Sequence, residues 1–231
     1  MSNAKKIILV IGGTGAQGSA VIRQLLAPKA KQISPYTIRL LTRDPTSRKV
    51  KEEFDELDDV EVVKGNFMDF DSVLKALQGV YGVFVNTDGF TVGEQSEVFA
   101  GMRIFELAKQ IGTIKHYVYS NLDYVFKKSG YKPIYNCEHY NGKGRVADWM
   151  QQQPSDEHGM VWSVLTSGPY MEMLHGGNFI PRIKEDGTRV FAVPLGKGHI
   201  PIVSVDDIGY FARYIFDNRS ATSAKDLEIA S

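Results

Sequence analysis

The stretch VIGGTGAQGSA, residues 10–20, places glycines at a spacing of three after an apolar run and before a helix-like stretch. Gly12, Gly15 and Gly18 form this series, and Gly13 is expected to open the turn. A helix N-terminus presents unpaired N–H groups and about +0.5 charge, and glycines let a phosphate approach that backbone closely. The alternative is a tight strand-to-helix turn without a ligand. The position of the glycine series between a strand and a helix favours dinucleotide binding.

Short β-branched runs alternate with helix-period stretches along most of the chain. The runs predict six strands, at residues 6–11, 37–42, 60–65, 80–86, 116–120 and 162–167. Between them, apolar stripes predict helices that include residues 21–26, 73–77 and 94–111. The strands are nearly all apolar, as in a sheet covered on both faces. The pattern predicts an α/β fold, a doubly wound parallel sheet of the Rossmann type.

The alternation loosens after residue 168. We expect residues 1–168 to form a dinucleotide-binding domain and residues 169–231 to form a small substrate or cap region that completes the same domain. Within that region, residues 205–216 are predicted to form one helix with Asp206 or Asp207 near its start.

The overall composition gives the protein no electrostatic preference for polyanions. Lys plus Arg and Asp plus Glu number 27 each, so no net field recruits nucleic acid or an anionic membrane surface. No apolar run approaches the roughly 20 residues of a membrane span, and MSNAKK at the start leads into no signal-peptide stretch. We expect a soluble cytoplasmic protein, with the nucleus as an alternative for a regulator.

The cysteine and histidine content argues against disulfides and metal centres. Cys137 is the single cysteine, so the chain forms no internal disulfide, and we expect this thiol to be inert packing. The histidines never fall at HxH or HxxxH spacing. No metal site is predicted.

The end of the second predicted strand, LLTRDP at residues 40–45, bears on which dinucleotide binds. NAD-binding folds usually have an acidic residue here, whereas Arg43 suits the 2′-phosphate of NADP through a charge-assisted contact of about 1.5–3 kcal/mol. Asp44 facing the ribose would favour NAD instead, but it is expected to start the turn before Pro45. The predicted phosphate shell consists of Thr42, Arg43 and either Arg48 or Lys49.

Several stretches together resemble the NmrA-like family of atypical short-chain dehydrogenase/reductase proteins, which bind NADP. They are IGGTGAQGSAVIRQLL (11–26), LLTRDP (40–45), VKGNFMD (63–69), GTIKHYVYSNL (112–122) and HYNGKGRVADWM (139–150). The resemblance covers nearly the whole chain. It implies a Rossmann fold and NADP as the cofactor.

The resemblance also implies which residues contact each part of the cofactor. The pyrophosphate loop corresponds to Gly12, Gly13, Thr14, Gly15, Ala16, Gln17 and Gly18. Arg43 corresponds to the residue on the 2′-phosphate. The adenine loop corresponds to Gly65, Asn66 and Phe67, the loop along the cofactor to Val85, Asn86 and Thr87, and the segment beside the nicotinamide to residues 169–173, with Pro169 and Tyr170.

The chain departs from the catalytic pattern of the wider superfamily, in which a Tyr stands four residues before a Lys. Lys143 fits the Lys, but His139 stands four residues earlier and Tyr140 three. Three interpretations of this pair remain open. In the first, His139 is a general acid or base with a pKa near neutrality; in the second, Lys143 holds the nicotinamide ribose and His139 is a polar helix residue that transfers no proton. In the third, both side chains are merely solvated. A second YxxxK, Tyr124 and Lys128, is expected to lie in a loop.

Ser120 ends the fifth predicted strand, where the superfamily has a substrate-polarising Ser, and is a candidate for that role or a simple cap. Family members usually continue for several tens of residues beyond the strand that matches DLEIA (226–230). The early end puts a closed hydride-transfer site in doubt and is expected to leave apolar surface for another chain to cover.

Two functions remain open from the sequence. The first is a cofactor-sensing regulator in which NADP(H) orders the loops around residues 88–96 and 169–182, and a protein partner recognises that surface. The second is an NADPH-dependent reductase of a quinone or small carbonyl substrate, with His139, Tyr140 or water supplying the proton. The absent tyrosine favours the first.

Overall fold

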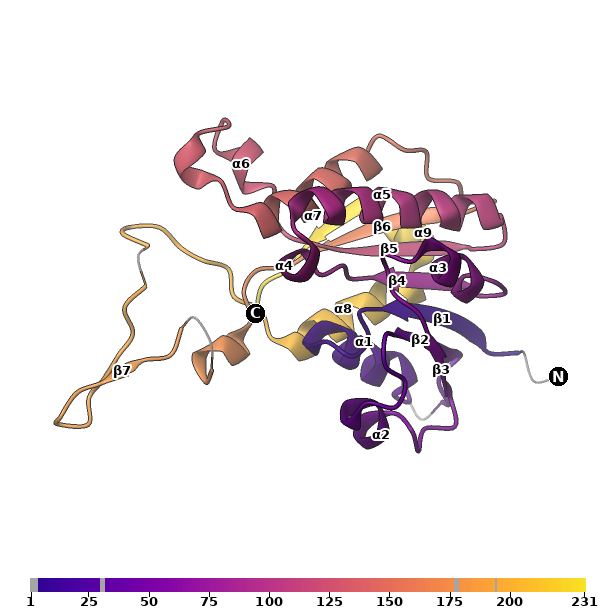
Figure 1. Ribbon diagram of the computed structural model, residues 1–231, viewed down its shortest axis with the longest axis horizontal. Helices are drawn as coiled ribbons and strands as arrows, with labels where there is room; N and C mark the ends of the chain where they lie inside the picture. Colours follow the sequence, from indigo (N-terminus) through magenta and orange to yellow (C-terminus); the bar gives the residue numbers. More distant parts are fainter. Residues whose placement is uncertain (1–3, 30–31, 177–178, 194) are drawn as a thin grey trace.

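The computed structural model describes residues 4–29, 32–176, 179–193 and 195–231. Its main sheet has seven parallel strands in the order β3-β2-β1-β4-β5-β6-β9 (Figure 1). These strands are β1 Lys6–Ile11, β2 Tyr36–Thr42, β3 Val60–Lys64, β4 Gly82–Val85, β5 His116–Asn121, β6 Val161–Thr166 and β9 Lys225–Glu228. The predicted doubly wound parallel α/β fold is therefore confirmed, and β9 overlaps the DLEIA stretch.

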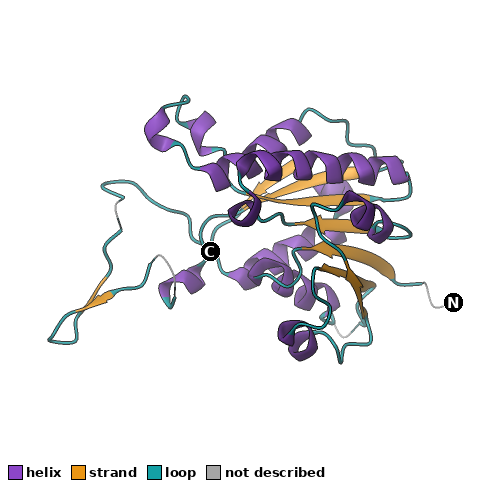
Figure 2. Ribbon diagram, viewed as in Figure 1, coloured by secondary structure: helices purple, strands orange, loops and turns teal. Residues whose placement is uncertain are grey.

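The helices cover both faces of the sheet (Figure 2). They are α1 Ala16–Leu26, α2 Arg48–Glu53, α3 Phe70–Ala76, α4 Gly89–Val92, α5 Glu94–Ile111, α6 Val125–Lys128, α7 Glu138–Met150, α8 Val205–Asp217 and α9 Arg219–Thr222. The expectation of a loop at 124–128 was wrong, because α6 makes one short turn there. None of the described helices is both long and apolar enough to cross a membrane.

The alternation of side chains along β1 divides the core in two. Ile8 and Val10 face a cluster formed with α1 and α8, whereas Leu9 and Ile11 face a cluster formed with α3, α5 and α7. All four side chains are almost completely buried. Successive residues of a strand point to opposite faces, so a sheet covered on both sides needs apolar residues at every position.

The region after residue 168 contributes both to the core and to a projection. Helix α8 packs against α1 so closely that a Cβ on Gly209 would lie 2.6 Å from the carbonyl oxygen of Ala20. By contrast, the hairpin of β7 (Arg182–Ile183) and β8 (Arg189–Val190) extends away from the body of the protein (Figure 1). The projecting segment exposes apolar side chains, among them Ile180, Ile183 and Phe191.

His116, at the start of β5, is buried as a neutral imidazole. Its Nε2 lies 2.9 Å from Ser163 Oγ, and Ser163 uses its one hydrogen to donate to the carbonyl of Thr222 at 2.8 Å. His116 Nε2 must therefore carry the proton, while its Nδ1 has no hydrogen-bond partner within the described residues. Burial, assisted by the positive charge of Arg219, lowers the pKa of His116 to about 3.

Because the pKa of His116 is lowered in the folded state, we expect the protein to lose stability in mild acid. The unfolded chain binds a proton at His116 below about pH 6.5, whereas the folded chain does not until pH falls to about 3. The free energy of unfolding should therefore fall on acidification from pH 7 to 5, with a limiting slope of about 1.4 kcal/mol per pH unit from this group. Urea unfolding across that range measures it.

His116→Gln removes the titrating group and should flatten this slope, even if it lowers stability at pH 7. His158→Gln, at an exposed position, is the matched control and should leave the slope unchanged. Equal slopes for His116→Gln and the wild type would contradict the assignment.

Candidate functional site

The carboxyl ends of the strands surround a cavity of about 500 Å³, here named the switch-point pocket. It lies where the strand order reverses between β1 and β4, the position at which open α/β sheets bind ligands. Its lining comprises Ile11, Gly12, Thr14, Gly15, Gln17, Leu41, Thr42, Arg43, Asp44, Ser47, Gly65, Asn66, Phe67, Asn86, Thr87, Asp88, Gly89, Phe90, Leu122, His139, Lys143 and Tyr170.

The glycine turn between β1 and α1 is built by direct backbone contact. Gly12 has a φ of +80°, and a Cβ there would lie 2.5 Å from the carbonyl oxygen of Asn86. The expectation that Gly13 opens the turn was wrong, because the positive φ falls on Gly12 while Gly13 packs against the side chain of Leu40. Gly18 rests on the backbone of Gly12, so the helix begins against the edge of the sheet.

The residues that the structure describes leave the N-terminus of α1 without a side-chain cap. Its N-cap is Gly15, no side chain caps it, and its first turn contains no acidic residue. Gly15 and Ala16 are exposed, and Gly15 lines the switch-point pocket. Free N–H groups and the helix dipole at this position form an anion-binding site, so the residues present fit a dinucleotide pyrophosphate.

Gly18→Ala tests the tight contact of this turn. Alanine raises helix propensity by about 1 kcal/mol, but its Cβ would overlap the carbonyl oxygen of Gly12 and the Cα of Gly13, which are backbone atoms. We expect a net loss of about 1–3 kcal/mol in the free energy of unfolding, measured by thermal or urea denaturation. Gly176→Ala, where a Cβ meets open space, is the control and should stay within about 0.5 kcal/mol of the wild type.

Arg43 is a free cation at one end of the switch-point pocket. It makes no hydrogen bond or ion pair with any other described residue. Asp44 is engaged elsewhere, since its Oδ1 accepts from the backbone N and the Oγ1 of Thr46 at 2.9 and 2.7 Å, which lowers the Asp44 pKa. The prediction that Asp44 starts the turn is therefore confirmed.

The two other cations predicted for the phosphate shell are directed elsewhere. On α2, Arg48 pairs with Glu52 at 3.8 Å and Lys49 pairs with Glu53 at 3.5 Å. Neither lines the switch-point pocket. Thr42 and Arg43 do line it.

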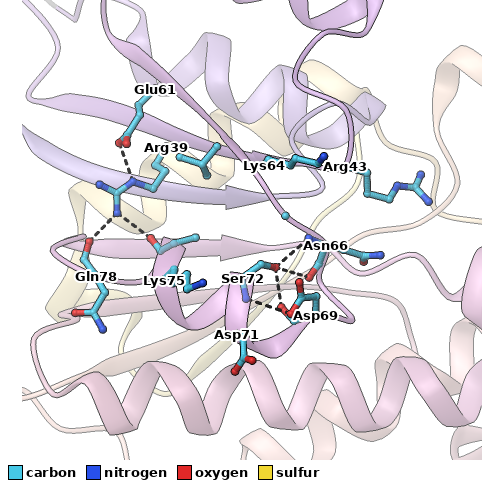
Figure 3. A pocket seen from close by; sticks show the side chains of 13 residues that line it. Arg39, Arg43, Glu61, Lys64, Asn66, Asp69, Asp71, Ser72, Lys75 and Gln78 are labelled. Carbon is cyan, nitrogen blue, oxygen red and sulfur yellow. Dashed lines mark hydrogen bonds and ion pairs between the residues drawn. The ribbon is translucent and has the colours of Figure 1, made fainter.

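A second cavity, of about 780 Å³, adjoins this end and shares Arg43, Gly65 and Asn66 with the switch-point pocket. Figure 3 shows the Arg39 guanidinium between Glu61 and Gln78, to which it donates at 2.7 and 2.6 Å, whereas the Arg43 guanidinium points away from this cluster. Arg39 is thus neutralised by its neighbours. Arg43 is available to an anionic group.

Lys143, on α7, lies at the opposite end of the switch-point pocket, and its side chain is nearly buried. Its Nζ donates to the carbonyl of Thr87 at 2.7 Å and to Asn86 Oδ1 at 3.2 Å, and it forms an ion pair with Glu97 Oε1 at 3.1 Å. Burial lowers the pKa of Lys143, and the Glu97 carboxylate opposes this effect. The structure therefore brings Lys143 together with Asn86, Thr87 and Glu97, and of these four residues all but Glu97 belong to the predicted cofactor site.

His139 lies one helical turn before Lys143 and stacks on Phe90 of α4, with ring centroids 4.4 Å apart. Tyr140 packs edge-on against it at 4.9 Å, and the Cys137 sulfur lies 3.5 Å from its Nδ1. Burial lowers the pKa of His139 below its ordinary value. The lowered pKa favours the neutral imidazole at pH 7, and a general acid or base role for His139 stays a prediction.

Ser120 is buried and faces a side chain of the glycine loop. Its Oγ donates to Gln17 Oε1 at 2.6 Å, and Gln17 Nε2 donates to the hydroxyl of Tyr170 at 2.8 Å. Gln17 and Tyr170 line the switch-point pocket, but Ser120 does not. This chain links β5 to the segment after β6 through the first turn of α1.

Most of the predicted site residues meet at the pocket, with a few exceptions. Tyr140, Val85, Gly13, Ala16, Gly18 and Pro169 support its walls without lining it, and Tyr124 and Lys128 lie elsewhere. Sequence reasoning missed Phe90, Leu122 and Glu97. Glu97 carried a signal, because it falls on the buried face of α5 with Ala100 and Gly101, where a charged residue is unusual.

The fold and the pocket define a Rossmann-type α/β protein of the dinucleotide-binding kind. The chain belongs to the NmrA-like family, whose sequence model matches residues 4–231. The resemblance drawn from the sequence is thereby confirmed.

Known proteins similar to this chain include enzymes and a regulator. An NmrA-like family domain-containing oxidoreductase, malD of Malbranchea aurantiaca, is 30% identical and aligns with 94% of this chain and 65% of its own length. An NAD(P)H azoreductase of Xenophilus azovorans is 29% identical and aligns with 89% of this chain and 62% of its own length. The chain thus spans somewhat under two thirds of these curated relatives.

The fold is also that of NmrA, a negative transcriptional regulator solved in complex with NADP and, separately, with NAD. Both structures give a TM-score of 0.78 at 20% identity, over 99% of this chain and 67% of theirs.

Proposed function

We propose that this chain binds NADP(H) and acts as an oxidoreductase on a quinone or small carbonyl compound. The observation that carries the proposal is the uncapped N-terminus of α1, which opens into the switch-point pocket between a free Arg43 and a buried Lys143. The oxidoreductase names of the relatives support the activity, as does the binding of NADP and NAD by the NmrA structures.

The two ends of the pocket suit the two ends of the cofactor. Arg43 is proposed to bind the 2′-phosphate, with Gly65, Asn66 and Phe67 beside the adenine. The bare amides of α1 are proposed to bind the pyrophosphate. Lys143 is proposed to contact the nicotinamide ribose by exchanging one of its present bonds for a ribose hydroxyl.

The bound cofactor supplies a hydride, and the chain must supply or admit the proton. His139 lines the pocket, and as a neutral imidazole it can relay a proton: its ring N–H donates to the substrate oxygen while the other ring nitrogen takes up a proton from water. Tyr140 is set behind it, and burial raises the pKa of its hydroxyl. His139, directly or through water, is therefore the proposed proton donor, and Phe90 forms the outer wall beside it.

Arg43→Ala tests the choice of cofactor. Loss of a charge-assisted contact should lower the ratio of NADP to NAD affinity about tenfold to a hundredfold, measured by calorimetry with both dinucleotides. Arg48→Ala removes the same charge from α2, where Arg48 pairs with Glu52, and should leave the ratio unchanged. An unaltered ratio in Arg43→Ala would refute the 2′-phosphate assignment.

Turnover tests the activity itself. NADPH and a panel of quinones and aldehydes should give enzyme-dependent loss of NADPH absorbance. His139→Gln should lower kcat about a hundredfold with NADPH affinity retained, because general acid catalysis contributes about that much. Tyr140→Phe, which keeps the packing behind His139, is the control and should retain kcat.

A protein that binds NADPH but reduces no acceptor would favour the cofactor-sensing regulator instead. In that case α4 and the segment after residue 168 would be the surface that a protein partner recognises. Residues 177 and 178 of the expected 169–182 loop lie outside the described residues.

A further inference from the structure

Glu97 is an acidic residue completely buried beneath the switch-point pocket. It stands in the first turn of α5, and its Oε1 accepts from Thr87 Oγ1 at 2.7 Å and pairs with Lys143 Nζ at 3.1 Å. The carboxylate therefore joins α5 to α7 and to the loop that follows β4. All three elements meet directly behind the pocket.

The ammonium of Lys143 has no spare hydrogen. A lysine donates three N–H bonds, and Asn86 Oδ1, the Thr87 carbonyl and Thr87 Oγ1 accept them at 3.2, 2.7 and 3.2 Å, while Glu97 Oε1 forms an ion pair with the ammonium at 3.1 Å. The direction of the Lys143 side chain is thus set by its partners, of which Glu97 alone is charged. Glu97 fixes both where the ammonium lies and how much net charge it presents.

The surrounding backbone is shaped for this side chain. Gly89 of α4 and Gly142 of α7 lie against Glu97 Oε2, and a Cβ at either position would approach that oxygen closer than normal packing permits. Within the described residues, Oε2 has no hydrogen-bond partner. Burying an ion pair with an unsatisfied oxygen costs stability, and well-packed apolar residues often stabilise such a position better. The presence of Glu97 at this buried position therefore points to a role in the site that outweighs the cost in stability.

We propose that Glu97 is a positioning residue that fixes Lys143 and cancels its charge at the nicotinamide end of the pocket. This inference rests on the proposed binding of NADP(H). An oxidised nicotinamide ring carries a positive charge and a reduced ring carries none, so an uncompensated Lys143 would repel the oxidised form selectively. With Glu97 in place, the Glu97–Lys143 pair is neutral, and the pocket accepts the oxidised dinucleotide as well as the reduced one.

Glu97→Gln tests this inference, because it keeps the shape and the acceptor oxygen but removes the charge. Calorimetry with NADP⁺ and NADPH should show the Kd for NADP⁺ rising about tenfold relative to the Kd for NADPH. Asp88, another charged residue of the lining, is unchanged in every variant. Glu94→Gln is the matched control: Glu94 lies in the same turn of α5, pairs with Arg145 at 2.8 Å, and its substitution should leave the ratio of Kd values unaltered.

Two variants at Lys143 separate charge balance from mere structural support. Glu97→Gln with Lys143→Gln removes both charges and should return the ratio to that of the wild type. Lys143→Gln alone leaves the carboxylate and should shift the ratio in favour of NADP⁺. This single variant also provides the measurement if Glu97→Gln does not fold.

The inference is overturned if Glu97→Gln weakens both dinucleotides equally, or if Lys143→Gln leaves the ratio unchanged. Failure of the proposed function looks different, because the wild-type protein would then bind neither dinucleotide.

Discussion

The site depends on contact between two pieces of backbone at the start of α1. Gly18 rests on Gly12, and Gly12 rests on the carbonyl of Asn86 after β4. Side chains are excluded from both contacts, so the helix begins at the edge of the sheet with its first N–H groups uncapped. In a chain without net charge, attraction for an anion has to be local, and this helix terminus together with Arg43 is its proposed source.

The sequence predicted the sheet because most of its strands are largely apolar on both faces, and it predicted the pocket because parallel strands present their carboxyl ends at one edge. Gly12, Thr42, Gly65 and Asn86 each follow or end a strand, so their convergence follows from topology alone. The Rossmann fold and most of the lining could be inferred without coordinates.

Other features depend on packing between distant segments. The bonds from Ser120 to Gln17 and from Gln17 to Tyr170 join residues about a hundred and about a hundred and fifty positions apart, which no local pattern encodes. The pKa of His139 falls because the fold partly buries its ring, and the sequence does not place Phe90 of α4 over His139 of α7. The positive φ at Gly12 rather than Gly13 likewise depends on where Asn86 and Leu40 lie.

Asn86 has a part in two contacts that were described separately. Its backbone carbonyl supports the glycine turn at the phosphate end, and its side-chain amide accepts from Lys143 at the other end. One residue thus takes part in both ends of the pocket. If a dinucleotide binds as proposed, its two halves would share Asn86 as a common support, and the geometry at one end would bear on the geometry at the other.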